Sequence, residues 1–162
     1  MYLDDRQLPF PVTTAAPAIP RPLAPTSHRV GAAIVAAACL ALLAVAAWLT
    51  PAPEGHGTHE QLGLPPCGWL VATGRPCPTC GMTTAFALAA DGDLAGSFAA
   101  HPFGAVLALG TAAAFWISLH VAIFGSRAGY LAGRLLQPRP LWLAAGAWGA
   151  GWAYKIATWP VQ

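Results

Sequence analysis

Residues 30–49 of the chain read VGAAIVAAACLALLAVAAWL, an apolar run without a charged residue. An α-helix rises about 1.5 Å per residue, so a run of this length suits a helix that crosses about 30 Å of hydrocarbon. A cleaved signal peptide with Arg29 as its charged flank is the rival interpretation, but the apolar region of such peptides is usually only about 7–15 residues long. We therefore predict a first transmembrane helix over 30–49.

The composition of the whole chain also indicates a bilayer as its solvent. The 162 residues are 56% hydrophobic and only 9% charged, and the mean hydropathy is +0.54. Water-soluble domains carry about 25% charged residues on average. The formal net charge is only +2, and no run of basic residues indicates a nucleic-acid partner. The expected partners are the lipid bilayer and either another membrane protein or a second copy of this chain.

Two further segments are candidates for crossing the bilayer. Residues 102–124 read PFGAVLALGTAAAFWISLHVAIF, and their first residue is a proline, which suits the first turn of a helix. Residues 141–159 read LWLAAGAWGAGWAYKIATW. Small residues four positions apart, as at Gly110/Ala114 and Gly146/Ala150, favour close packing between such helices. We predict transmembrane helices over both segments.

Lys155 is the charged residue of the third segment and lies near its end. The butyl stem of a lysine can carry the ammonium group to the lipid headgroups. The aromatic residues around it, Trp152, Tyr154 and Trp159, are typical of a belt at the membrane interface. We therefore expect Lys155 to act as an anchor at the membrane surface.

The remaining segments complete the predicted fold and its orientation. Residues 1–29 are rich in proline, which predicts a disordered tail. This tail and the 125–140 loop are richer in arginine than the 50–101 loop, which contains only Arg75. Because positive flanks stay inside, the tail and the 125–140 loop should be cytoplasmic, and the composition suggests a bacterial inner membrane. The fold class is an all-α membrane protein with three transmembrane helices and an outer, cysteine-containing loop that carries two short helices.

The distinctive chemistry of the chain lies in this outer loop. Cys67, Cys77 and Cys80 are spaced C-x9-C-x2-C, and the last two belong to the sequence CPTCG. Pro78 suits the first position of a helix, so we expect a helix that begins directly after Cys77 and ends near Ala90. An aspartate at position 93 should cap a second short helix that runs to residue 100.

Three chemistries remain open for these thiols. Cys67, Cys77 and Cys80 could bind zinc, with a fourth ligand taken from His56, His59 and His101. A CxxC pair at a helix N-terminus could instead exchange disulfides, with Cys77 as the attacking thiol and Cys80 as the resolving thiol. The third interpretation is structural, with a disulfide between Cys67 and either thiol of the pair, or with unpaired thiols that only pack.

The loop and the segment after it resemble a known family. A cysteine, a TGxxCPxCGMT motif, a short apolar helix, a GDL step and an HP pair before an apolar helix are similar to the small bacterial membrane proteins catalogued as domain of unknown function 2752. The matching residues are Cys67, Thr73, Gly74, Cys77, Pro78, Cys80, Gly81, Met82, Thr83, Gly92, Asp93, Leu94, His101 and Pro102.

This resemblance covers residues 67–124 and implies an integral membrane protein without an assigned reaction. Many members have arginine at the position of Thr84, so this chain lacks that cation beside its thiols. We therefore expect a noncatalytic small helical bundle or an accessory subunit. A membrane thiol-disulfide oxidoreductase that uses Cys77 and Cys80 is the alternative, and a zinc-binding loop is the third hypothesis.

Overall fold

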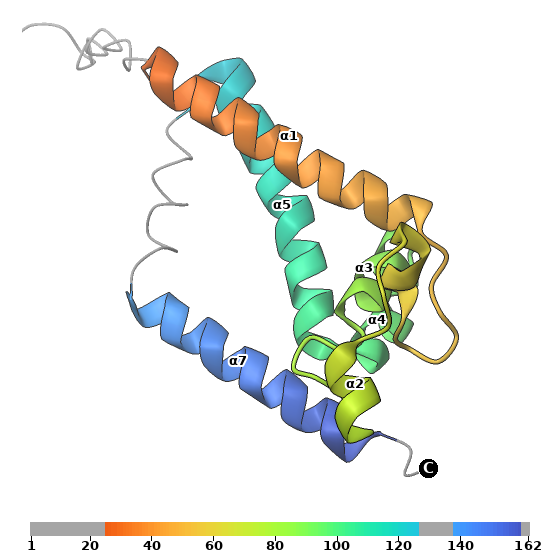
Figure 1. The fold of residues 1–162 in the computed structure, drawn as a ribbon. Coiled ribbons are helices and arrows are strands. Elements are labelled where there is room, and N and C mark those ends of the chain that lie inside the picture. Colours follow the sequence, from red (N-terminus) through yellow and green to blue (C-terminus); the bar gives the residue numbers. More distant parts are fainter. Residues whose placement is uncertain (1–24, 127–137, 160–162) are drawn as a thin grey trace, which may run out of the picture.

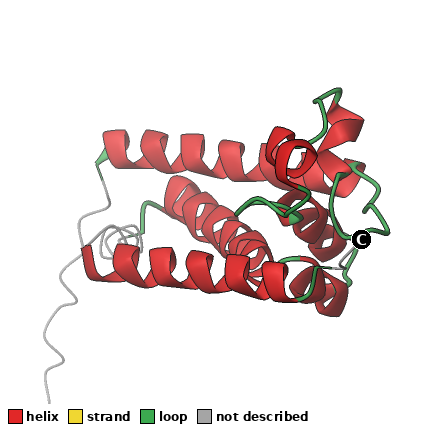
Figure 2. Ribbon diagram, turned by 60° about the horizontal axis from the view of Figure 1, so that its bottom comes forward, coloured by secondary structure: helices red, strands yellow, loops and turns green. Residues whose placement is uncertain are grey.

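The computed structural model describes residues 25–126 and 138–159, and all regular structure in these ranges is helical (Figures 1 and 2). The long helices are α1 (Thr26–Trp48), α5 (Pro102–Phe124) and α7 (Pro138–Ala157). Short helices gather where α1 ends and α5 begins (Figure 1): the 3-10 helix η2 (Thr58–Leu62), α2 (Gly68–Thr73), α3 (Met82–Ala90) and α4 (Leu94–Ala100). The predicted all-α architecture is confirmed for the described residues.

Two of the described helices, α1 and α5, are long and apolar enough to cross a membrane, with mean hydropathies of 2.6 and 1.9 in their most apolar windows. The prediction of three such spans is therefore corrected to two candidates. Helix α7 has the length of a span, but its glycines and Lys155 lower its mean hydropathy.

Helix α1 begins at Thr26, four residues before the expected start, so residues 26–29 are helical and do not belong to the tail. The Arg29 side chain explains why the first turn is held: its Nε and Nη2 donate to Ala122 O at 3.1 Å and to Ile123 O at 3.0 Å. These carbonyls lie in the last turn of α5, where a cation is favourable. The predicted tail over 1–24 and most of the 125–140 loop lie outside the described residues.

Small side chains fill the buried faces of α1 and α5. Ala36 and Ala46 on α1 and Ala105 and Ala108 on α5 are buried, which lets these helices and the neighbouring α3 approach one another closely. Large apolar side chains of both helices point outward instead; Ile34, for example, is 65% exposed. Packing between these helices therefore rests on small residues, and their outer faces are suited to hydrocarbon.

The glycines that make close contacts differ from most of those expected. A Cβ added at Gly110, Gly146 or Gly149 would meet nothing within 4 Å. A Cβ at Gly104 would lie 3.1 Å from Ala85 Cβ, and a Cβ at Gly151 would lie 3.1 Å from Phe103 Cβ. The close approaches thus bring α3 and α7 against the first turn of α5, where the short helices gather.

We expect Gly104→Ala to lower the free energy of unfolding by about 1–3 kcal/mol, because the added methyl group enters a packed contact with α3. Gly110→Ala on the same helix is the matched control and should leave stability unchanged or raise it by up to about 1 kcal/mol, since alanine favours helix. Thermal unfolding of both variants in one detergent measures the difference. Equal melting temperatures would contradict the described packing of α3 on α5.

A candidate thiol site at the CPTCG turn

The CPTCG sequence forms a turn that precedes helix α3. The Cys80 N–H donates to Cys77 O at 3.0 Å, and the Met82 N–H donates to Thr79 O at 3.0 Å. Helix α3 begins at Met82, with Gly81 as its N-cap at a φ of 88°. The expectation that a helix begins at Pro78 is therefore wrong, because the left-handed conformation of Gly81 separates the turn from the helix. The expected help from a helix dipole at Cys77 is lost with it.

Glycine is required at position 81 for two reasons. Its positive φ is a conformation that other residues rarely adopt. In addition, a Cβ at this position would lie 2.5 Å from Gly55 O and 3.1 Å from Ala100 O. The CPTCG turn therefore packs directly on the backbone of the 50–57 segment and on the end of α4.

Three side chains hold the turn from behind, and we call His101, Trp152 and Lys155 the turn clamp. Trp152 Nε1 donates to Pro76 O at 3.1 Å, and His101 Nε2 lies 3.3 Å from Pro78 O. Lys155 Nζ donates to the two carbonyls that border Gly81, Ala100 O at 3.0 Å and Gly55 O at 3.2 Å. The clamp thus satisfies backbone acceptors on both sides of the turn, which would be costly to leave unpaired.

Lys155 is not the anchor at the membrane interface that the sequence predicts. Its side chain is only 6% exposed and points inward, where two backbone carbonyls take the place of water. The neighbouring Trp152 indole also points inward to a carbonyl, whereas Tyr154 is 40% exposed. The sequence pattern predicts an aromatic belt around a surface lysine, but Lys155 itself and one of the three aromatic residues, Trp152, belong to the clamp.

His101 is fully buried and links two parts of the family motif. The Gly104 N–H donates to His101 Nδ1 at 3.0 Å, so His101 is the N-cap of α5 and Pro102 follows as its first residue. With Nδ1 as acceptor, the ring proton lies on Nε2 and is donated to Pro78 O. Burial, together with the nearby Lys155 charge, lowers the pKa of His101 below its ordinary 6.5. This neutral, doubly bonded ring has a structural role.

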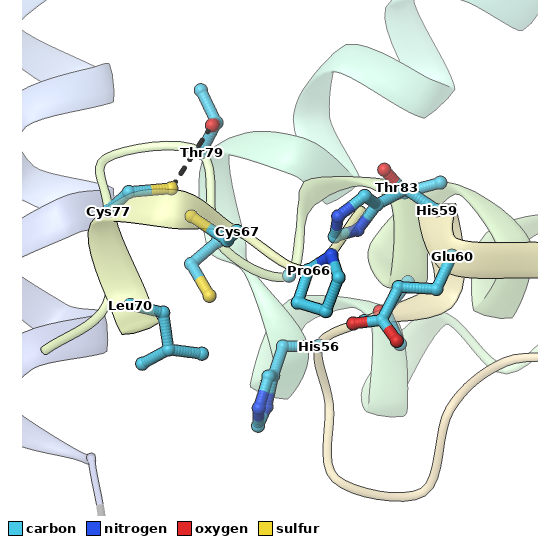
Figure 3. A pocket seen from close by; sticks show the side chains of 13 residues that line it. His56, His59, Glu60, Pro66, Cys67, Leu70, Cys77, Thr79 and Thr83 are labelled. Atoms are coloured by element: carbon cyan, nitrogen blue, oxygen red, sulfur yellow. Dashed lines mark hydrogen bonds between the residues drawn. The ribbon is translucent and has the colours of Figure 1, made fainter. Parts of the chain in front are cut away.

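The three thiols of the loop line one cavity of about 260 Å³ (Figure 3). Cys67 is the N-cap residue of α2, and Cys77 and Cys80 belong to the turn. Figure 3 shows Cys67 beside Cys77, with His59 and Glu60 across the cavity. Thiols that lie 58 or more positions before the start of α7 are therefore brought to the turn that the clamp supports.

The two thiols of the CxxC pair have different surroundings. Burial acts to raise the pKa of Cys77, but hydrogen bonds from the Thr79 side chain and backbone, and from Cys67 and Cys80, outweigh it, so the pKa lies below its ordinary 9.0. Thr79 Oγ1 lies 3.4 Å from Cys77 Sγ. Burial and the adjacent Cys77 raise the pKa of Cys80 to about 11, against the opposing charge of Lys155. Cys77 is thus partly exposed and the more acidic thiol of the pair, whereas Cys80 is buried and held as a thiol.

The zinc hypothesis loses one of its expected ligands. Both ring nitrogens of His101 are bonded within the protein, so this ring is not free for a metal. His56 and His59 do line the cavity with the three cysteines. Within the described residues, however, no group of three or more His, Cys, Asp or Glu side chains is arranged to hold a metal ion.

Thr84 has a buried hydrogen-bond partner that sequence reasoning missed. Its hydroxyl group is fully buried and lies 2.8 Å from Thr58 Oγ1, which also accepts a hydrogen bond from Ala52 N–H. This pair ties α3 to η2, which forms one wall of the cavity. The contact could not be predicted from the sequence, because the two threonines are 26 residues apart.

The fold and the site thus define a small helical protein with two candidate membrane spans and a thiol-lined loop. Residues 67–116 match the model of the family described as protein of unknown function (DUF2752), which confirms the resemblance over this segment. Comparisons with curated proteins and with solved structures give no match. The matched segment contains the CPTCG turn, α3, α4 and His101, but not the α7 half of the clamp.

Gly81→Ala should destabilise the protein by about 2–4 kcal/mol, because it combines a positive φ with a clash against backbone. Gly74→Ala is the matched control: φ is +65°, but the added Cβ meets nothing within 4 Å. This control should lose only about 1–2 kcal/mol. Thermal unfolding in detergent measures both variants, and an equal loss would show that the close packing at Gly81 is absent.

Stability should fall as the pH is lowered below about 6.5, because His101 binds its proton more weakly in the folded protein than in the unfolded chain. The contribution is complete above the unfolded pKa, decreases as the pH falls toward the lowered folded pKa, and is constant below it. His101→Asn can still cap α5, and it should remove this part of the pH dependence. Melting temperatures from pH 5 to 8 provide the measurement, and identical profiles would contradict a buried neutral ring.

Proposed function

We propose that the protein is a membrane thiol-disulfide exchange protein in which Cys77 attacks and Cys80 resolves. The observation that carries the proposal is the asymmetry of the pair: a partly exposed Cys77 with a lowered pKa adjoins a buried Cys80 whose pKa is raised to about 11. A thiolate is the attacking species in disulfide exchange. This asymmetry favours exchange over the noncatalytic role first expected, in which the thiols need only pack.

The turn geometry also suits closure of the bond. A hydrogen-bonded four-residue turn keeps its first and fourth Cα atoms within about 7 Å, and a disulfide requires about 4.4–6.8 Å. Cys77 and Cys80 are the first and fourth residues of such a turn. The clamp fixes the carbonyls of Pro76 and Pro78, so little backbone movement is needed when the bond forms.

The exchange step balances with a protein or small-molecule disulfide as the partner. The Cys77 thiolate attacks one sulfur of that disulfide, a mixed disulfide forms, and the other partner sulfur leaves as a thiolate. Cys80 then loses its proton to water and attacks Cys77 Sγ, which expels the second partner sulfur. The partner gains two electrons and two protons, and Cys77 and Cys80 are left joined; the reverse sequence oxidises a dithiol.

We further propose that this chemistry takes place on the outer face of a bacterial inner membrane. The support is the arginine-rich flanks of the candidate spans, together with a fold in which α1 ends and α5 begins at the cysteine end (Figure 1). The partner would be a thiol-containing membrane or extracytoplasmic protein.

The test is trapping of the mixed disulfide with oxidised glutathione in the full chain in detergent. Cys80→Ser should accumulate glutathione on Cys77, because the resolving thiol is missing, whereas Cys77→Ser should abolish the reaction. Wild type should form the Cys77–Cys80 bond, which peptide mass mapping identifies. Cys39→Ser, which removes the thiol within α1, should behave as wild type.

Two results would overturn the proposal. If neither glutathione nor a stronger thiol oxidant joins Cys77 to Cys80 in the folded wild type, the noncatalytic interpretation stands. If the purified protein carries an equivalent of zinc that protects all three loop thiols from alkylation, the zinc hypothesis replaces exchange.

A further inference from the structure

We propose that Lys155 is a positioning residue of the thiol site, whose ammonium group stabilises the negative charge that forms on Cys80 when the Cys77–Cys80 bond opens. This inference rests on the proposed exchange function and extends it. It assigns a role in the chemistry to a residue of α7, which lies outside the segment that matches the family.

The first argument is the location of the ammonium group. Lys155 Nζ lies 3.2 Å from the point that a Cβ of Gly81 would occupy, and Gly81 directly follows Cys80. Both side chains are buried, with exposures of 6% for Lys155 and 7% for Cys80. In such surroundings the interaction between two charges is much stronger than in water.

The second argument concerns the ionisable groups that lie close enough to interact with the charge of Lys155. Among the residues that the structure describes, the ionisable side chains whose pKa values the Lys155 charge shifts are Cys80 and His101. His101 is neutral and uses both ring nitrogens, so only the thiol can become an anion. Glu54 and His56 line a neighbouring cavity of about 630 Å³ together with Lys155. Lys155 itself donates to neutral carbonyls, which satisfy its hydrogen bonds without cancelling its charge.

The third argument is the direction of bond opening. An external thiolate reaches the partly exposed Cys77 more readily than the buried Cys80. It bonds to Cys77 Sγ, the Cys77–Cys80 bond breaks, and the electron pair stays on Cys80 Sγ, which later takes a proton from water. A second external thiolate then releases Cys77 and leaves as a disulfide with the first. A cation beside Cys80 makes it the better leaving group.

Thr84 forms a buried hydrogen bond with Thr58 and brings no charge to the site. In this chain the cation beside the thiols comes from Lys155, which is 71 positions further along the sequence than Thr84.

The test measures how fast glutathione opens a Cys77–Cys80 bond that has first been formed with diamide in the purified full chain. Lys155→Gln keeps an amide donor for the carbonyls but removes the charge, and should slow opening about tenfold, the effect of roughly two pKa units on the leaving thiol at a Brønsted slope of about 0.5. Lys155→Arg keeps the charge and should stay within about threefold of wild type. Trp152→Phe removes the other hydrogen bond from α7 to the turn without changing charge, so it measures how much a loosened clamp alone slows opening, and its effect should be smaller than that of Lys155→Gln.

The rate of opening should also vary with pH in a way that packing alone would not produce. Wild type and Lys155→Arg should share one pH profile while lysine is charged, and at higher pH only wild type should slow, because arginine keeps its charge. Lys155→Gln should stay slow throughout the range in which lysine is charged. If Lys155→Gln opens as fast as wild type, or if Trp152→Phe is slowed equally, Lys155 acts only through packing and this inference is wrong, while exchange itself stands. If the wild-type bond cannot be formed, the exchange proposal and this inference fail together. Lys155→Met provides a second uncharged variant if the glutamine does not fold.

Discussion

The structure depends on the need to satisfy backbone carbonyls in an apolar interior. The carbonyls of Pro76 and Pro78 flank the CPTCG turn, and those of Gly55 and Ala100 lie beneath it. Each would cost about 1–3 kcal/mol if it were buried without a donor. The turn clamp supplies the donors from a histidine, a tryptophan and a lysine. These donors come from the N-cap of α5 and from α7. The bonds that offset the desolvation cost therefore also hold the C-terminal half of α7 against the turn.

The clamp explains how a loop without strands can present an ordered group of thiols. Cys67 is placed by the start of α2, and Cys77 and Cys80 are placed by the turn. The backbone of that turn is held from behind, so its side chains remain free to face the cavity. One side of the turn thus accepts the hydrogen bonds that hold it in place, and the other side bears the thiols.

Features that depend on neighbours in the sequence could be predicted, and those that depend on distant partners could not. Asp93 caps α4 by accepting from Gly96 N–H at 2.8 Å, and the HP pair begins α5, as local rules indicate. The same rules misplaced the start of α3, because they favour Pro78 at a helix start and do not reveal that Gly81 is left-handed. Lys155 was misassigned because a lysine among aromatic residues reads as a surface anchor until its carbonyl partners, 55 and 100 positions away, are known.

One residue, His101, ends α4 and begins α5, with a φ of −161°. No linker residue therefore separates α4 from α5 at this joint. Insertion of a single amino acid would rotate the imidazole away from both Pro78 O and Gly104 N–H, and no nearby segment offers a substitute. Tolerance of changes in length should therefore be confined to stretches such as 61–66, which are exposed and lie outside the helices that meet at this joint.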